Sequence, residues 1–346
     1  MPNGAWPACK KTSQKPPCAI KRLKFTKRFW QNVADKTADR ILIIKLAALG
    51  DFVQALGPMA AIRKHHKNAH LVLLTSAPYV DFAKAANLFD EVWIDEFRPK
   101  AWQLGRIKAL RKQLKSGHFD RVYDLQTSDR SGFYYKILGS GPEWSGIAKG
   151  CSHPHANPDR NLMHTLERQK EQLNMAGISD VQAPDFLWAK SDVDRFDLPR
   201  PYAVLVPGGA PHRPAKRWPE AGYTELANHM LSEGITPVLL GAGAELGILQ
   251  VIKHEAPGTV NLGGKTDFID IATLAQNAAV AVGNDTGPMH LIAAVNCPCV
   301  VLYSHDSNPD LCAQRGKAVK IIRKETLKTL AEPEVWAKVQ ESLTGG

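Results

Sequence analysis

The sequence has no apolar run close to the roughly 20 residues that a membrane-spanning helix requires. It also lacks the apolar core of a secretory signal near its N-terminus. Cysteine is scarce, with six residues scattered through a chain of 346. These absences argue against a membrane-spanning protein and against a disulfide framework, and they predict a protein of the reducing cytoplasm.

Paired metal-ligand motifs are also missing. Cys297 and Cys299 form a C-x-C pair with Cys312 as a distant third, which differs from the paired C-x-x-C pattern of zinc sites, and Cys299 lies in an apolar, strand-like run. The sequence therefore predicts no metal site and no resident cofactor. No repeat of short fixed period is present, which argues against solenoids and propellers.

Positive charge is concentrated at the N-terminus. Residues 1–40 hold ten Lys/Arg and two Asp/Glu, whereas the whole chain has a formal charge of +10, so the remainder is nearly neutral. Leu23, Phe25, Phe29 and Trp30 interleave with these cations, which favours an anionic membrane surface as the partner of residues 10–40 over nucleic acid, which we do not expect. A solvated extension that binds nothing is the alternative.

The remaining chain is long enough for two domains and alternates short apolar runs with helical patterns. Buried strands at 41–44, 70–75, 91–94 and 202–206, each followed by a helix-like segment, are typical of doubly wound parallel sheets. We expect an α/β protein with two Rossmann-like lobes facing a cleft. Residues 139–160, rich in glycine and proline, are expected to form a loop over that cleft.

The expected domains follow from these patterns. They are a basic N-terminal extension (1–39), an N-terminal Rossmann-like domain (40–190), a linker (191–201), a C-terminal Rossmann-like domain (202–325) and a C-terminal helical tail (326–346).

The segment 282–290, VGNDTGPMH, has the composition of a strand-to-helix turn. Glycines let the backbone approach a ligand closely, and Pro288 suits the first turn of a helix. The free amides and the helix dipole would then favour an anion such as a diphosphate. The alternative is that Asp285 or Thr286 merely caps the helix, and the motif matches neither a P-loop nor G-x-G-x-x-G.

Four segments in order resemble the ADP-heptose:lipopolysaccharide heptosyltransferases of glycosyltransferase family 9. They are residues 41–58 with Leu49-Gly50-Asp51, the K-x-W-P motif at 216–219, the G-x-x-x-E turn at 241–245, and the signature GNDTGPMHLIAA at 283–294. The similarity covers roughly residues 40 to 325 and excludes only the basic arm. It implies a glycosyltransferase B fold, with the acceptor bound by the first lobe and the nucleotide-sugar by the second.

The resemblance also implies catalytic roles. Asp51 matches the catalytic base, which takes a proton from the acceptor hydroxyl as that oxygen attacks and inverts the anomeric carbon. Its alternative role is the N-cap of a helix starting at Phe52. Lys216 matches the lysine that contacts the donor phosphates and stabilises the leaving diphosphate without a metal. The alternative for Lys216 is a solvated loop charge.

The remaining implied site residues bind the nucleotide-sugar. Glu245 matches an acidic residue near the nucleoside, where a carboxylate can accept two ribose hydroxyls, or else it is a first-turn acid of the next helix. His290 is either a donor to the diphosphate or a core histidine. The full nucleotide-sugar set is Lys216, Glu245, Asp285, Thr286, Gly287, Pro288 and His290.

Two segments depart from the family pattern. Residues 206–211 offer backbone amides where relatives carry Ser/Thr, and Tyr303 is followed by Ser-His-Asp-Ser rather than a glycine-proline turn. The expected function is transfer of heptose from ADP-heptose to the lipopolysaccharide inner core at the cytoplasmic membrane face. Alternatives are a different NDP-sugar donor or a protein acceptor, a sugar-nucleotide epimerase, and a non-catalytic nucleotide-binding module.

Overall fold

The computed structural model of the chain describes residues 39–96, 103–139, 141–210 and 212–344. Apart from its last two residues, the basic arm therefore lies outside the described residues. Arg40 already belongs to the folded body, where its side chain pairs with Glu91 at 3.1 Å and its amide donates to Asp120. Within the described part of the chain, no helix combines the length and apolar character needed to cross a membrane.

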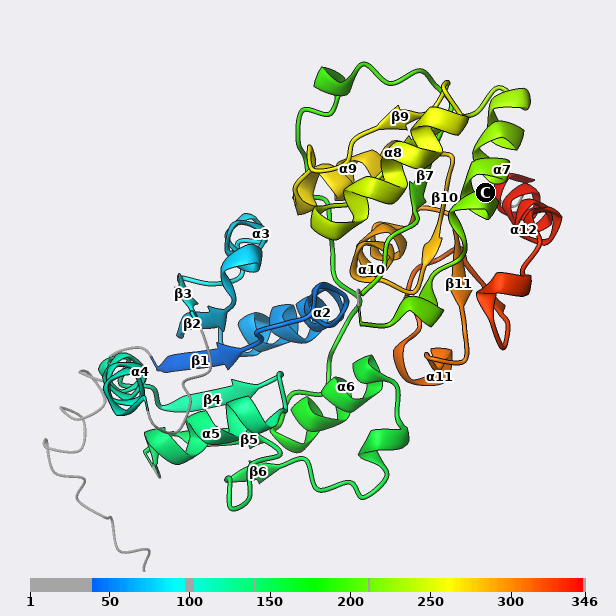
Figure 1. Cartoon of the computed structure of the whole chain (residues 1–346). Coiled ribbons are helices and arrows are strands. Elements are labelled where there is room, and N and C mark those ends of the chain that lie inside the picture. Colours follow the sequence, from blue (N-terminus) through cyan, green and yellow to red (C-terminus); the bar gives the residue numbers. More distant parts are fainter. Residues whose placement is uncertain (1–38, 97–102, 140, 211, 345–346) are drawn as a thin grey trace, which may run out of the picture. The chain divides into compact units, whose positions relative to one another are not determined.

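The first lobe is built on a six-stranded parallel sheet of order β3-β2-β1-β4-β5-β6 (Figure 1). Its strands are β1 (Arg40–Ile44), β2 (His70–Thr75), β3 (Glu91–Ile94), β4 (Arg121–Asp124), β5 (Glu143–Gly146) and β6 (His153–Pro154). Its α-helices are α2 (Leu49–His65), α3 (Val80–Ala85), α4 (Leu104–Ser116), α5 (Asp129–Leu138) and α6 (Thr165–Met175).

The second lobe repeats this plan with a parallel sheet of order β12-β11-β10-β7-β8-β9. Its strands are β7 (Tyr202–Val206), β8 (Thr236–Leu239), β9 (Val260–Asn261), β10 (Val280–Asn284), β11 (Cys299–Tyr303) and β12 (Val319–Arg323). Its α-helices are α7 (Glu220–Ser232), α8 (Leu246–Glu255), α9 (Phe268–Asn277), α10 (Gly287–Ala294), α11 (Pro309–Cys312) and α12 (Glu332–Thr344).

Alternation of side chains along the central strands explains why both faces of each sheet are covered. In β7, Ala203 and Leu205 face the cluster under α7, α8 and α12, whereas Val204 packs on the opposite face. That opposite cluster is continuous from the first lobe to the second, because α2 packs against α10 (Figure 1). Glycine permits this close packing: a Cβ on Gly287 would lie 2.8 Å from Leu49 Cβ.

The expected loop over 139–160 is wrong. β5 and β6 lie within it and extend the first sheet by two strands. Glycine and proline obscured these strands in the sequence, although Trp144 is fully buried between helix and sheet. The segment 282–290, expected as a strand-to-helix turn, begins inside β10, since Gly283 and Asn284 are the last two residues of the strand and both are buried.

Candidate active site

The turn between β10 and α10 contains only Asp285 and Thr286, because the strand runs to Asn284 and the helix begins at Gly287. Thr286 occupies the N-cap position, and Pro288 lies in the first turn. The first amides of a helix have no partner within it, so this turn points donors and a positive dipole end away from the strand.

Side-chain capping, the alternative proposed for Asp285 and Thr286, is wrong. Thr286 makes no side-chain hydrogen bond to the helix, and its buried Oγ1 is without a partner. Asp285 instead accepts hydrogen bonds from three other segments: Lys216 Nζ at 2.7 Å, Ser307 Oγ at 2.7 Å and Gln314 Nε2 at 3.0 Å. The carboxylate is therefore the centre of a polar network and not a local cap.

The network sets the charge state of Asp285. Burial alone would raise the pKa of this carboxyl, but the hydrogen bonds from Lys216 and Ser307 outweigh it and hold the pKa below its usual value. Gln314 is itself oriented, since Tyr303 donates its hydroxyl to Gln314 Oε1 at 2.8 Å. An ionised Asp285 thus keeps the Lys216 ammonium at the start of α10.

Lys216 comes from the 3-10 turn Pro214–Lys216 that follows β7. Its side chain is only 13% exposed, which argues against the solvated loop charge considered from the sequence. The neighbouring Trp218 anchors the segment: its amide donates to Asn284 Oδ1 and its indole donates to the carbonyl of Leu330. The K-x-W-P motif thereby fixes a cation beside the β10–α10 turn.

His290 lies one turn into α10 and is neutral, because burial lowers its pKa to about 4. Gln54 of the first lobe places its Nε2 3.0 Å from His290 Nδ1 and 3.3 Å from the carbonyl of Ala313. An amide nitrogen that faces a carbonyl is the donor, so His290 Nδ1 accepts and Nε2 carries the proton. That Nε2 lies 3.9 Å from Asp285 Oδ1.

Asp51 lies in the first turn of α2, which begins at Leu49 and not at Phe52. The N-cap role considered from the sequence is therefore wrong, although Asp51 Oδ2 accepts the amide of Ala48 at 3.4 Å. The glycine before it permits close contact between the lobes, because a Cβ on Gly50 would lie 2.5 Å from the His290 ring. Asp51 consequently faces the same region as α10.

The charges of Asp51, Lys216 and Asp285 converge in space. All three act electrostatically on the Cys312 thiol, whose pKa is raised to about 11, by burial first and then by Asp285. The negative charges of Asp285 and Asp51 also act electrostatically on His290, where they oppose the lowering of its pKa by burial. The fold thus brings a carboxylate of the first lobe to the cation and helix N-terminus of the second.

Glu245 lies on a neighbouring loop of the same sheet edge. Its Oε1 accepts the amide of Gly209 at 2.8 Å and its Oε2 accepts that of Ala242 at 3.1 Å. It ends the 3-10 turn Gly243–Glu245 and is the N-cap residue of α8, so it is also an acid at a helix N-terminus, the alternative considered from the sequence. A Cβ on Gly208 would lie 2.0 Å from Glu245 Oε1, so a larger residue there would displace the carboxylate from this position. Within the described part of the chain, no hydrogen bond links Glu245 to the Asp285 network, but each of its carboxylate oxygens keeps a further lone pair.

Sequence reasoning missed a polar cluster at the carboxyl ends of β1 and β4. Lys45 is 3% exposed and donates to the carbonyl of Leu125, and burial lowers the pKa of its ammonium. Asp124 is fully buried, and burial raises its pKa to about 6 despite two backbone hydrogen bonds to Oδ1. A polar residue directly after or at the end of each strand was the available signal, since ligands bind at that edge.

Two arginines adjoin this cluster. Arg160 donates to Thr127 Oγ1 at 3.3 Å, and burial followed by repulsion from Arg168 lowers its pKa. The positive charge of Arg168 also helps to lower the pKa values of Lys45 and Arg160. The carboxyl edge of the first sheet is therefore rich in cations suited to an anionic ligand. Among the described residues, no group of three or more His, Cys, Asp or Glu side chains is arranged to hold a metal ion.

Known proteins with the same organisation are heptosyltransferases. Lipopolysaccharide heptosyltransferase 2 of Escherichia coli K12 is 37% identical over 249 residues, covering 64% of this chain and 70% of that protein. The corresponding protein of Salmonella typhimurium LT2 is 36% identical with the same coverage. Lipopolysaccharide heptosyltransferase 1 of E. coli K12 is 26% identical and covers 87% of this chain and 99% of that protein.

Solved structures show the same fold. The structure of E. coli ADP-heptose lps heptosyltransferase II has a TM-score of 0.71 at 22% identity and covers 88% of this chain and 99% of that one. A glycosyltransferase family 9 structure from Veillonella parvula has a TM-score of 0.75 at 18% identity, covering 90% and 99%. The two doubly wound parallel sheets are those of the glycosyltransferase B fold, as the sequence predicts.

The family model of glycosyltransferase family 9 matches residues 107–338, which include the K-x-W-P motif, Glu245 and the whole β10–α10 turn. This match extends over more than half of the chain, and the same family is indicated by the relatives described above. On this combined evidence, the chain belongs to glycosyltransferase family 9, the heptosyltransferase family.

Proposed function

We propose that this protein transfers heptose from ADP-heptose to the inner core of lipopolysaccharide, with inversion at the anomeric carbon. Its family membership and its 37% identity to a lipopolysaccharide heptosyltransferase support the donor and acceptor classes. The observation that carries the proposal is the convergence of Asp51 from one lobe with Lys216 and Asp285 from the other.

Asp51 is the general base in this proposal. Its carboxylate removes the proton from the acceptor hydroxyl while that oxygen forms the bond to the anomeric carbon and the bond to the diphosphate breaks. Direct attack from the opposite face inverts the configuration. The position of Asp51 in the first turn of α2 supports this role, because the neighbouring Gly50 packs against His290 of the donor lobe and the Asp51 charge acts on that histidine.

The donor diphosphate lies at the N-terminus of α10 in this proposal. Amides of Thr286, Gly287 and the following turn supply hydrogen bonds, and Pro288 fixes the helix start without needing a donor of its own. Lys216 stabilises the negative charge that develops on the leaving diphosphate, so we propose a metal-independent reaction. The neutral His290 offers its Nε2 proton as a further donor.

Glu245 accepts the ribose hydroxyls of the nucleoside. Its bonds to Gly209 and Ala242 support this role, because they fix the carboxylate between the loops that follow β7 and β8. The loop after β7 lacks hydroxyl side chains, so its own contribution to phosphate binding comes from backbone amides.

We assign acceptor binding to residues 40–190 and donor binding to 202–325, joined by 191–201. The cations at the carboxyl edge of the first sheet, Lys45, Arg160 and Arg168, support an anionic acceptor there. We also propose that the enzyme works at the inner face of the cytoplasmic membrane as a peripheral protein, with residues 10–40 contributing positive charge.

The test is transfer and ADP release with ADP-heptose and a panel of other NDP-sugars, comparing wild type with Asp51→Asn and Lys216→Gln. Loss of general base catalysis should lower transfer by Asp51→Asn by about 100-fold or more. The matched control is Asp81→Asn, an exposed carboxylate in α3 of the same lobe.

Undiminished ADP release by Asp51→Asn would refute the assignment of the base. A wild-type protein that uses another NDP-sugar and ignores ADP-heptose would refute the donor, and release of an epimerised sugar-nucleotide would refute transfer itself.

A further inference from the structure

Helix α4 of the first lobe carries a stripe of cations along its whole solvent face. Helical spacing places residues 104, 108, 111, 112 and 115 on one side, opposite the buried Leu110 and Leu114. Lys108, Arg111, Lys112 and Lys115, the α4 basic stripe, are all exposed. The helix contains no acidic residue.

These cations lack carboxylate partners within the described ranges. Arg111 donates only to the carbonyl of Ile137, and the three lysines form no ion pair there. Other cations of the same lobe are paired, such as Arg63 with Asp90 and Arg121 with Glu143. The charge of the stripe is therefore available to an external anionic partner.

The stripe does not help the helix to fold. Like charges three or four residues apart, such as Lys108 with Lys112 and Lys112 with Lys115, repel one another on a helix surface. Only Lys115 lies in the last turn, where the helix dipole favours a cation. A surface that weakens its own helix is better explained by an external partner than by local stability.

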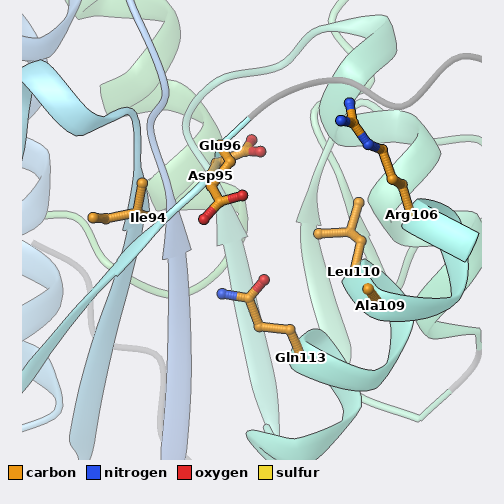
Figure 2. A pocket seen from close by; sticks show the side chains of 7 residues that line it. All are labelled: Ile94, Asp95, Glu96, Arg106, Ala109, Leu110 and Gln113. Carbon is orange, nitrogen blue, oxygen red and sulfur yellow. The ribbon is translucent and has the colours of Figure 1, made fainter.

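The acids near α4 lie on its other flank. Figure 2 shows a hollow of about 450 Å³ in which Asp95 and Glu96, at the end of β3, face Arg106 and Gln113 of α4. Asp95 is neutralised there by Arg130, at 2.7 Å, and by the Tyr134 hydroxyl. The hollow separates these carboxylates from the stripe, because residues 106 and 113 lie on a different side of the helix from 108 and 112.

An exposed apolar side chain accompanies the cations. Leu104 is 64% exposed and lies one turn before Lys108 on the same face. Cations combined with isolated large aliphatic side chains fit a bilayer interface, where charge meets the headgroups and the apolar groups enter the acyl boundary. A nucleic acid would satisfy the cations but not Leu104.

We propose that the α4 basic stripe, with Leu104, docks the first lobe on the surface of an anionic phospholipid bilayer. This inference rests on the proposed function, in which the acceptor is held in such a membrane. It adds a docking surface on the folded body to the charge of residues 10–40 and keeps the acceptor lobe next to the bilayer while donor exchange occurs on the other lobe.

The experiment measures partitioning of the full chain onto vesicles of phosphatidylglycerol and phosphatidylcholine in roughly equal parts, at low and high salt. Each cation near an anionic surface changes partitioning by roughly fivefold, so Lys108→Glu/Lys112→Glu should reduce binding by at least about 20-fold. The charge-matched control is Arg323→Glu/Lys328→Glu on the second lobe, where both side chains are exposed; it should change binding by less than about threefold.

A second pair, Lys108→Gln/Lys112→Gln, removes charge without adding repulsion and should reduce binding by about 10-fold or more if α4 makes the contact. Equal binding by wild type and both α4 variants would overturn the proposal, as would an equal loss in the control. Loss of duplex DNA binding with unchanged vesicle binding would overturn it in favour of a nucleic acid.

Heptose transfer to a detergent-solubilised acceptor separates this inference from the proposed function. All variants should retain wild-type transfer in detergent, because the stripe is remote from Asp51 and Lys216 in the fold. Absent transfer by the wild type would contradict the proposed function, whereas unchanged vesicle binding by the α4 variants would contradict only the docking surface.

Discussion

Lys216 and Asp285 form a salt bridge of 2.7 Å between Nζ and Oδ2, with side chains that are 13% and 7% exposed. The lysine comes from the turn after β7 and the aspartate from the turn after β10, so the pair joins two adjacent strand ends. Asp285 also accepts hydrogen bonds from Ser307 and Gln314, so the position of the Lys216 ammonium depends on the segment that follows β11.

Replacing Asp285 with Asn removes the charge of the side chain but nearly keeps its shape. The buried Lys216 loses its counter-ion, so the free energy of unfolding should fall by about 3–5 kcal/mol. Transfer should fall by about 100-fold, because the ammonium is no longer fixed beside α10. Urea denaturation and ADP release measure the two effects. Asp306→Asn, in the loop that follows β11 and paired with His305, is the control; an equal effect there would contradict a specific role for Asp285.

Gln314 should act as a positioning residue for Asp285. Gln314→Leu keeps a similar volume but removes the donor to Asp285 and leaves Tyr303 without its acceptor. We expect the free energy of unfolding to fall by about 1–2 kcal/mol and kcat to fall more than KM rises. Gln314→Glu should not restore kcat, because its carboxylate would face Asp285. Recovery by Glu would show that the amide donor is not needed.

The buried His290 should make stability depend on pH. Burial depresses its pKa from 6.5 to about 4, so the unfolded chain binds a proton at a pH where the folded chain does not. Its contribution is complete above pH 6.5 and is lost as the pH falls towards 4. The difference between these two pKa values corresponds to a change of about 3 kcal/mol in the free energy of unfolding. His290→Asn, which can still accept from Gln54, should flatten this part of the curve. Unaltered pH dependence in the variant would contradict the assignment.

Asp124 should make stability depend on pH in the opposite direction to His290. Burial raises its pKa from 3.8 to about 6, so its contribution is fully present below pH 3.8 and is lost as the pH rises through about 6. Asp124→Asn cannot ionise and can still accept the amides of Gln126 and Thr127. The difference in the free energy of unfolding between this variant and wild type should therefore shift in favour of the variant by up to about 3 kcal/mol between low pH and pH 8. Denaturation at both pH values measures this difference. The same difference at low pH and at pH 8 would contradict a raised pKa of Asp124.

Local patterns in the sequence identified most of the fold. The strands at 70–75 and 202–206 have the bounds expected from their apolar spacing. Errors arose where local signals conflict with tertiary packing. Glycine and proline in 139–160 indicate a loop, yet β5 and β6 are strands because β4 offers a free edge and Trp144 fills the space beneath α5. The helix α2 begins three residues early because its first turn packs against α10.

The sequence by itself determined the two-lobed α/β architecture, the family and the segments that we propose as the active site, because strand periodicity and the four motifs are local properties of the chain. Only the tertiary structure decided what these side chains contact. It replaced the capping role of Asp285 with a bridge to Lys216, gave His290 its Nε2 proton through Gln54, and revealed Asp124 as a buried acid. Such partners are more than 60 residues apart in the chain, and only folding of the two sheets fixes their distances.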